Sequence, residues 1–341
     1  MPILSLCIPT YNRSALLGEA LHAIVSQLDA DALAQVEIVI ADNDSPDDTE
    51  AFVARFQAAH PDAPIVYFRQ PQNLGGDANV NTLLKLAHGD YLYILSDDDI
   101  LLPGAIAKLL TALRAEPPYD AVCLNLCTFA TAPDQTSAPI FALPQDQVFH
   151  GRDASLAFLS TWLTFLSAMA FRRERIAGKD YADKVGSYFL HSHVFVDALS
   201  PDGAMLVTAE PFLAVRSNNT GVYNFFQTFL TRFANVLAYA ESIGYSRKAT
   251  RDSLARHRPF ILGFVLTFKI HGAYGQLKPD YWDGIRRLVQ VYRHDPLFLI
   301  RVIPLMLLPQ SVVLFLRRFY RGLTRRKQTT TVKSVQSAWG P

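Results

Sequence analysis

Short apolar runs alternate with stretches of helical periodicity through the first third of the chain. Runs rich in β-forming residues predict strands at Ile3–Ile8, Val36–Ala41, Ile65–Arg69, in the Gly89–Asp99 element, and at Tyr119–Leu124. Between them, apolar residues recur every three or four positions, as expected of helices that pack on a sheet. This alternation predicts an α/β fold with a doubly wound, mostly parallel sheet and helices on both faces.

The first helix is expected directly after the first strand. Leu17, Leu21 and Ile24 share one face at near-helical spacing, and Ser14 is a suitable N-cap residue. Further along, Gly203–Val215 has the pattern of a pair of strands.

The fourth expected strand ends in three consecutive carboxylates, Asp97, Asp98 and Asp99. Adjacent acids repel one another, so a cation is expected among them. Hard carboxylate oxygens suit Mg²⁺ or Mn²⁺, which bind one or two carboxylates together with water and substrate phosphates. The alternative is a solvated acidic turn that caps the helix after Pro103, because acids favour helix N-termini.

Polar clusters follow the other strands as well, and parallel strands place these clusters on the same edge of the sheet. They are Pro9-Thr10-Tyr11-Asn12-Arg13, Asp42-Asn43-Asp44-Ser45-Pro46 and Asn73-Leu74-Gly75-Gly76-Asp77. The second and third could equally be an Asx-turn with a helix cap and an ordinary turn into a helix. Neither of the common glycine-rich phosphate loops is present in the sequence, so phosphate charge would have to be met by a metal ion.

Composition narrows the class of protein. The formal net charge of +1 argues against a nucleic-acid partner, while the hydrophobic share of 50% and the mean hydropathy of +0.12 suggest a membrane or partner surface. Cys7, Cys123 and Cys127 have no metal-ligand spacing and suggest a reducing compartment. A strand at the very start leaves no room for a signal peptide, so we expect the chain to face the cytoplasm.

The ordered clusters resemble family 2 glycosyltransferases, and the Asn79-Val80-Asn81 and Ser-Asp-Asp-Asp variants are similar to bacterial O-antigen and capsule enzymes of the abequosyltransferase-like type. The resemblance covers residues 2–115. It implies a GT-A fold and a metal-dependent, inverting transfer of a hexose or deoxyhexose from a nucleotide-sugar. It does not identify the sugar.

The resemblance also implies roles for individual residues. Pro9, Thr10 and Asn12 would line the nucleoside pocket, Asp42 would meet the base, and Asp97 would lie near the ribose. Asp98, with Asp99, would hold Mn²⁺ or Mg²⁺ on the diphosphate, as in the DXD motif. The remaining members of the expected nucleotide-sugar site are Tyr11, Arg13, Asn73, Gly75, Asn81 and Arg216.

An inverting transfer needs a base for the acceptor hydroxyl. Relatives often carry a Glu-Asp pair after a Tyr-Phe-like segment, but here Tyr188-Phe189-Leu190 is followed by His193 and Val194 at that point. His193 and Asp197 share a helix face at i, i+4 and are the candidate catalytic residues. A histidine in an aromatic stretch can equally be a packed core residue. Arg216 could close on the pyrophosphate, or it could be a surface arginine.

The second half is expected to be helical from 223 to 295, with breaks near Gly244, Gly272 and Gly275. The apolar segment 296–316 is interrupted by Arg301, Pro304, Pro309 and Gln310, and a basic run follows it. This pattern suits helices in the interface of an anionic membrane; a buried hairpin and a membrane span are the alternatives. A lipid-linked acceptor, as the resemblance implies with undecaprenyl diphosphate, would place the enzyme peripherally on the cytoplasmic face of the bacterial inner membrane.

These expectations divide the chain into a GT-A domain at 1–222, a helical membrane-associating region at 223–327 and a disordered tail at 328–341. Two rival functions remain open. A sugar-phosphate nucleotidyltransferase shares the sheet, although the glycines of its first loop are missing here. A non-catalytic nucleotide-sugar-binding subunit at the membrane is suggested by the missing Glu-Asp pair.

Overall fold

A computed structural model describes the chain except for residues 131–132, 134–135, 218–222, 274–278 and 328–341, and for 319–327 it describes the backbone alone. The described residues form two compact units: Met1–Ser217 with Val236–Ser253, and Asn218–Asn235 with Leu254–Pro341. The expected boundary at residue 222 differs from this division, because Val236–Ser253 belongs to the first unit.

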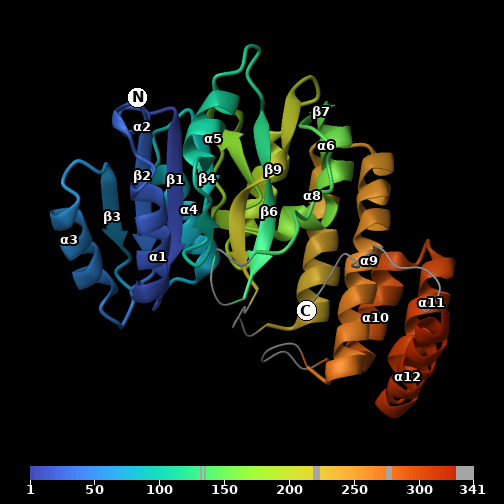
Figure 1. Cartoon of the computed structure of the whole chain (residues 1–341). Helices are drawn as coiled ribbons and strands as arrows, with labels where there is room; N and C mark the ends of the chain where they lie inside the picture. Colours follow the sequence, from blue (N-terminus) through green and yellow to red (C-terminus); the bar gives the residue numbers. More distant parts are fainter. Residues whose placement is uncertain (131–132, 134–135, 218–222, 274–278, 328–341) are drawn as a thin grey trace. The chain divides into compact units, whose positions relative to one another are not determined.

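The first unit is built on one twisted sheet (Figure 1) whose strand order is β3-β2-β1-β4-β8-β6-β9-β5, with β7 paired to β9. The strands are β1 Leu4–Thr10, β2 Val36–Asp42, β3 Ile65–Arg69, β4 Tyr91–Ile94, β5 Ile100–Leu101, β6 Ala121–Phe129, β7 Gln147–His150, β8 Met169–Arg172 and β9 Ala204–Arg216. The pairs β1–β2, β2–β3 and β1–β4 are parallel, so β1, β2 and β4 end at one edge.

The α/β architecture predicted from the pattern is therefore confirmed, with two local corrections. β8 enters antiparallel between β4 and β6, which the alternation did not indicate. The segment expected to form two strands is the single strand β9, which pairs with β6 along its length and with β7 and β5 at its two ends. The register between β6 and β9 shifts around the pair Asn125–Pro211, and such an irregularity in one long strand can look like a break between two.

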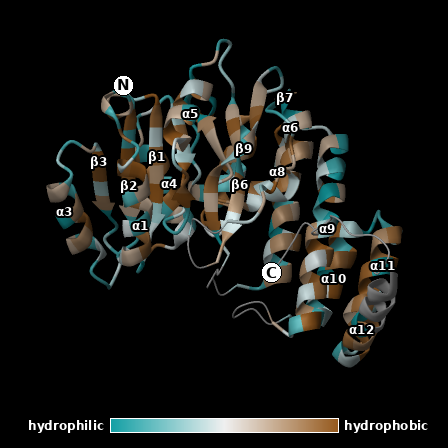
Figure 2. Cartoon of the chain, in the orientation of Figure 1, coloured by the Kyte–Doolittle hydropathy of each residue, from teal (hydrophilic) through white to brown (hydrophobic). Residues whose placement is uncertain are grey.

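The helices of the chain are α1 Ser14–Val25, α2 Ala30–Leu33, α3 Thr49–Ala59, α4 Gly76–Leu86, α5 Ala105–Leu113, α6 Arg152–Leu159, α7 Leu190–Ala198, α8 Phe233–Ser242, α9 Arg247–His271, α10 Tyr281–Tyr292, α11 Pro296–Leu307 and α12 Gln310–Lys327. Leu17, Leu21 and Ile24 of α1 are fully buried in the main core with the strands. This burial confirms the face that their spacing predicted. Figure 2 shows that the central strands of the sheet are largely hydrophobic.

The start of α1 corrects the expected cap. Ser14 is the first helical residue rather than the N-cap, and its backbone N–H donates to Asp47 Oδ2 at 3.1 Å. The other Asp47 oxygen accepts from the backbone N–H of Thr49 at 3.1 Å, at the start of α3. One carboxylate after β2 therefore fixes the beginnings of two helices at the same edge of the sheet.

The second unit is helical and has its own aromatic core. Phe225, Phe226 and Phe268 pack there with Val302 and Met306.

The expected helix breaks are confirmed at Gly244 and Gly272, which have φ of +97° and +79°, a conformation that glycine adopts without strain. Gly275 lies outside the described residues.

Candidate active site

Side chains from the ends of β1 and β4 meet at the carboxyl edge of the sheet. Thr10 Oγ1 donates to Asp97 Oδ2 at 2.7 Å. Arg13 Nη1 lies 3.1 Å from Asp97 Oδ1 and 3.3 Å from Asp98 Oδ2, so one guanidinium bridges two consecutive carboxylates. Residues more than eighty positions apart thus form one charged cluster, at the position where open α/β sheets bind ligands.

The three aspartates lie in different environments. Asp97 is buried, and this burial raises its pKa to about 6, although the charge of Arg13 and the hydrogen bond from Thr10 act in the opposite direction. Asp99 is also buried and accepts from Ser167 Oγ at 2.8 Å; desolvation holds its pKa well above the usual range. The side chain of Asp98 is 20% exposed, and its Oδ1 accepts from Ser96 Oγ at 2.6 Å.

This difference bears on the expected metal ligands. Asp98 offers a hard, partly open carboxylate and fits a Mg²⁺ or Mn²⁺ ion that takes its other ligands from phosphates and water. Asp99 does not fit that role in this arrangement, because its carboxyl group is enclosed and hydrogen-bonded within the protein. Among the described residues no group of three or more His, Cys, Asp or Glu side chains could hold a metal ion.

Asp42, expected to meet the base, ends β2 and is fully buried. Its Oδ1 accepts from the backbone N–H and hydroxyl of Ser45 at 2.9 and 2.5 Å, and its Oδ2 accepts from the Tyr67 hydroxyl at 2.6 Å. Ser45 Oγ also accepts from the backbone N–H of Asn12 at 2.8 Å, and Asn12 has a φ of +55°. Asp42 thus holds together the loops after β1 and β2. Because a carboxylate can accept about four hydrogen bonds and three are described here, a contact with a base would use the remaining lone pair.

The loop after β3 is tied to the same edge. Asn43 Nδ2 donates to Asn73 Oδ1 at 2.9 Å, and Asn43 Oδ1 accepts from the backbone N–H of Leu74 at 2.9 Å. Gly75 precedes α4 with a φ of +84°. The structure therefore brings Asn73 and Gly75 to the edge where Asp42 ends its strand.

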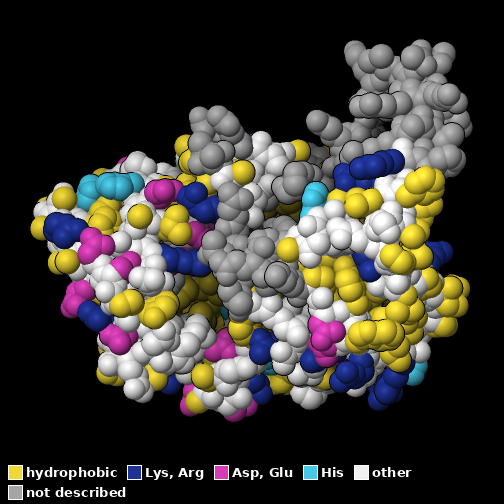
Figure 3. Space-filling view, turned by 90° about the horizontal axis from the view of Figure 1, so that it is seen from below, with side chains coloured by type: hydrophobic (Ala, Val, Ile, Leu, Met, Phe, Trp, Pro, Cys, Tyr) yellow, Lys and Arg dark blue, Asp and Glu magenta, His cyan; other side chains and the backbone are white. Residues whose placement is uncertain are grey.

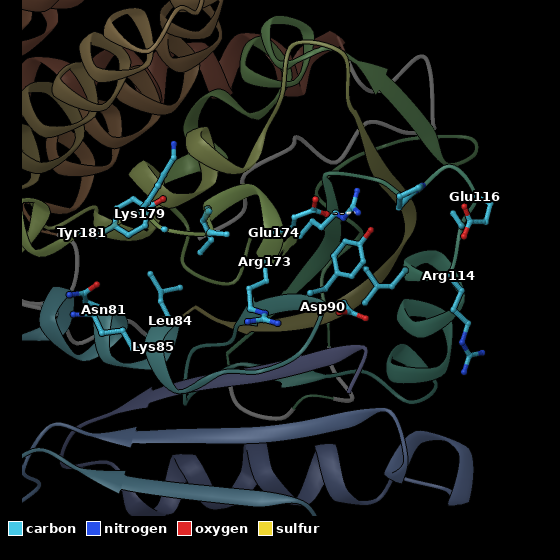
Figure 4. Close-up of a pocket in the computed structure, with 18 residues that line it drawn as sticks. Asn81, Leu84, Lys85, Asp90, Arg114, Glu116, Arg173, Glu174, Lys179 and Tyr181 are labelled. Atoms are coloured by element: carbon cyan, nitrogen blue, oxygen red, sulfur yellow. Dashed lines mark ion pairs between the residues drawn. The ribbon is translucent and has the colours of Figure 1, made fainter. Parts of the chain in front are cut away.

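Asn81 lies elsewhere, which corrects the expectation for this residue. It lines a cavity of about 770 Å³ together with Asp90, which precedes β4, and Arg173, which follows β8 (Figure 4). Asp90 lies at the end of β4 opposite to the one that Asp97 follows. The asparagine of α4 that does reach β2 is Asn79, whose Nδ2 donates to the carbonyl of Ala41 at 2.6 Å. The helix turns Asn81 away from that contact, since positions two apart face different sides.

The two candidate bases on α7 have unlike surroundings. The side chain of Asp197 is 0% exposed; it forms an ion pair with Lys179 and accepts from the hydroxyls of Tyr181 and Tyr239 at 2.9 and 2.8 Å. His193 Nδ1 lies 2.9 Å from the Phe189 carbonyl, and burial lowers the pKa of His193. A neutral ring that donates from Nδ1 keeps its lone pair on Nε2. Asp197 thus belongs to a buried ion pair with both of its carboxylate oxygens engaged, whereas the Nδ1 of His193 is held by a backbone carbonyl.

Arg216, at the end of β9, pairs with Glu19 Oε2 at 2.5 Å and covers the ring of Phe129, with its guanidinium 4.7 Å from the ring centroid. These contacts do not direct it to the aspartates, although its backbone hydrogen-bonds to Asp99. Residues 218–222, which follow it closely, lie outside the described residues.

A family model agrees with this cluster. The model described as "Glycosyl transferase family 2" matches residues 5–175, half of the chain, and these residues include every member of the cluster around Asp97. The chain belongs to glycosyl transferase family 2.

Curated relatives in sequence lead to the same family. The chain is 28% identical to abequosyltransferase RfbV of Salmonella typhimurium over 230 residues, which cover 64% of this chain and 67% of that protein. It is 39% identical over 111 residues to the GalNAc(5)-diNAcBac-PP-undecaprenol beta-1,3-glucosyltransferase of Campylobacter jejuni, a match that covers 32% of this chain and about a third (34%) of that protein.

Solved structures support the GT-A fold. The chain resembles S. aureus TarS 1-349 with a TM-score of 0.58 at 15% identity, over 85% of this chain and 81% of that one. For the same TarS fragment in complex with UDP the TM-score is 0.60 at 14% identity, over 98% and 95%. At these identities the likeness concerns the fold alone.

Sequence reasoning missed several partners in this family 2 site. Ser167 and Tyr67 hold Asp99 and Asp42, yet neither lies in a motif, and only the folded sheet brings them there. Asp77 was noted only as part of a turn. Its carboxylate accepts hydrogen bonds from the segment before α7. The only sequence signal for Asp77 was its position as an acid in the first turn of a predicted helix, now α4.

Proposed function

We propose that this protein is an inverting, metal-dependent glycosyltransferase that moves a sugar from a nucleotide-sugar to a lipid-linked glycan in bacterial surface polysaccharide synthesis. The observation that carries the proposal is the cluster of Thr10, Arg13, Asp97 and Asp98 at the carboxyl edge of the sheet. Family membership supports the reaction class, and the printed names of the two curated relatives motivate the O-antigen setting and an undecaprenyl-diphosphate-linked acceptor.

In this proposal the loops after β1, β2 and β3 bind the nucleoside. Asp42 meets the base, and the Asn73–Gly75 loop closes the same end of the pocket. Asp97 accepts from the ribose, which is consistent with its position beside Thr10. Arg13 places positive charge at the diphosphate, where a guanidinium can donate two hydrogen bonds.

Asp98 would hold Mn²⁺ or Mg²⁺. The ion, when bound, would neutralise charge on the leaving nucleoside diphosphate. The enclosed carboxyl group of Asp99 supports the floor of the site through Ser167 rather than joining the metal.

His193 would take the proton of the acceptor hydroxyl. Its Nδ1 is held by the Phe189 carbonyl, which fixes the ring and leaves Nε2 as the proton acceptor. Because burial lowers the pKa of His193, the ring is neutral and ready to act as a base at neutral pH. The new glycosidic bond forms on the acceptor oxygen as the bond to the nucleoside diphosphate breaks.

The second unit would bind the membrane that carries the acceptor. Leu297 and Ile300 of α11 are 70% and 69% exposed, and Phe315 of α12 is 66% exposed, whereas Phe298 and Val302 are buried. In Figure 3 hydrophobic side chains lie beside arginines and lysines on the helices at the right-hand side. From Pro296 to the last residue the sequence contains basic side chains and no Asp or Glu. An apolar face in a segment whose charged residues are all basic suits an anionic lipid surface.

Among the described residues no single helix is long and apolar enough to span a membrane. Only α11 and Gln310–Arg318 together reach that length and hydropathy, and they are bent by 105°.

Membrane binding is tested by sedimentation with vesicles of phosphatidylglycerol and, separately, of phosphatidylcholine. Wild type is expected to sediment with the anionic vesicles, and Ile300→Asp with Phe315→Asp to remain in solution. Val148→Asp, which places the same charge on an exposed apolar residue of β7, should sediment like wild type. Equal binding of all three proteins would contradict the proposed surface.

The function itself is tested by release of nucleoside diphosphate. UDP-, GDP-, CDP- and dTDP-sugars are each incubated with Mn²⁺ and an undecaprenyl-diphosphate-linked saccharide. Acceptor-dependent release from one donor supports a transferase. Binding of a nucleotide-sugar with no release under any acceptor would instead support the non-catalytic subunit. Family membership already argues against the nucleotidyltransferase.

A further inference from the structure

Asp77 connects the donor side of the site with the helix that carries His193. Its Oδ2 accepts from the backbone N–H groups of Tyr188 and Gly186 at 2.7 and 2.9 Å and lies 3.4 Å from Ser187 Oγ. Its Oδ1 accepts from the backbone N–H of Leu190, the first residue of α7, at 3.3 Å. A single carboxylate from the first turn of α4 thus accepts hydrogen bonds from three of the five backbone N–H groups of the turn at 186–190.

This turn has an unusual backbone. Tyr188 has a φ of +71° and Gly186 a φ of +90°. A left-handed conformation is ordinary for glycine, but it is strained for a large side chain such as tyrosine. Such strain persists only where the surroundings enforce it, and it gathers at functional sites. The charge-assisted hydrogen bonds to Asp77 are contacts of a kind that can enforce it here.

The two ends of this connection carry the expected chemistry. Asp77 comes directly after Gly75 and Gly76, which follow the Asn73 loop on the nucleotide side. The turn at 186–190 leads into α7, which carries His193. The Nδ1 of His193 is bound by the carbonyl of Phe189, four residues earlier. The carboxylate also favours the N-terminus of α7 through the helix dipole.

We propose that Asp77 is a positioning residue: it holds the strained turn at 186–190 and thereby sets the place of His193 relative to the nucleotide-binding loops. The inference rests on the proposed function, because His193 is the base only in that reaction. It concerns geometry and assigns Asp77 no contact with substrate.

The test compares Asp77→Asn with Asp183→Asn. Asp183 is a suitable control because it is an exposed acid whose charge also acts on His193, but its side chain pairs with Lys184 rather than with the turn. Both variants remove one negative charge near His193, and only the first removes a charged acceptor from the 186–190 backbone.

Hydrogen exchange of the peptide that covers 186–190 is measured first, since it needs no activity. Exchange should be at least tenfold faster in Asp77→Asn and unchanged in Asp183→Asn. In transfer assays kcat should fall by about 100-fold in Asp77→Asn, because a small misplacement of a reacting group has an effect of that order. The Kd for the nucleotide-sugar should stay within threefold of wild type.

Unchanged exchange in Asp77→Asn would overturn the inference. So would faster exchange with a wild-type kcat, or an equal loss of kcat in Asp183→Asn. If wild type itself shows no transfer, the proposed function fails and the positioning role falls with it, while the exchange result still reports whether Asp77 holds the turn. The two failures are therefore distinguishable.

Discussion

The guanidinium of Arg13 lies 3.3 Å from the carboxylate of Asp98, the most open of three consecutive aspartates. The same nitrogen reaches Asp97, so a side chain that follows β1 balances part of the negative charge that follows β4. This relation explains how the protein keeps adjacent carboxylates together. In the proposed function, the same guanidinium lies at the diphosphate.

Replacing Arg13 by glutamine should weaken nucleotide binding by about tenfold or more, because a charge-assisted contact is lost. It should also destabilise the protein more at pH 8 than at pH 5. Arg13 lowers the pKa of Asp97, which burial nevertheless raises to about 6. Without Arg13 that pKa rises further; at pH 5 the buried group is protonated and needs no partner, whereas at pH 8 it is charged. Urea midpoints at the two pH values check this, and an equal loss at both would contradict it.

His193→Gln should lower kcat by about 10²- to 10⁴-fold and leave the Kd for the nucleotide-sugar unchanged, since a general base contributes in that range. In wild type the rate should fall on acidification only below the ordinary histidine pKa of about 6.5, because burial lowers the pKa of His193 and the base must be neutral. His191→Gln is the control, as His191 is a buried ring on the same helix. Full activity of His193→Gln would exclude this base.

Asp197→Asn should reduce stability and spare the chemistry. The change leaves Lys179 without its carboxylate, while the hydroxyls of Tyr181 and Tyr239 can still donate to the amide oxygen. Because Lys179 is partly exposed, we expect a loss of about 1–3 kcal/mol in urea unfolding, below the usual value for a fully buried pair. A variant with normal stability and no turnover would instead return Asp197 to the role of base.

His257 provides a test of stability against pH in the second unit. It is fully buried, its Nε2 lies 2.8 Å from the Phe229 carbonyl, and burial lowers its pKa to about 4. The unfolded chain takes up this proton near pH 6.5 but the native protein only near pH 4, so the stability that His257 contributes is lost as the pH falls between these values. His257→Gln keeps a donor for the carbonyl and should make the unfolding midpoint of this unit less sensitive to pH between 7 and 5. An unchanged pH dependence would contradict the buried neutral ring.

The carboxyl edge of the sheet could be predicted because the strands β1 to β4 alternate with helices, and parallel strands bring their ends together. The unequal burial of Asp97, Asp98 and Asp99 could not, since it depends on Ser167 and on β8 and β9, which join the sheet from far along the chain. The burial of Asp197 could not be predicted from the sequence for a similar reason. Its partner Tyr239 lies on α8, 42 positions further along the chain, and no local pattern connects the two residues.

The central claim is that Asp98 completes a metal-dependent nucleotide site. Calorimetric titration of UDP, CDP, GDP and dTDP, each with and without Mn²⁺, tests it on wild type, Asp98→Ala and Asp99→Asn. We predict that wild type binds one nucleotide tightly with Mn²⁺, that Asp98→Ala loses this binding, and that Asp99→Asn keeps it, because the carboxyl group of Asp99 is buried and hydrogen-bonded to Ser167 rather than open to a metal ion. Binding of no nucleotide by wild type, or metal-dependent binding that survives in Asp98→Ala, would contradict the account.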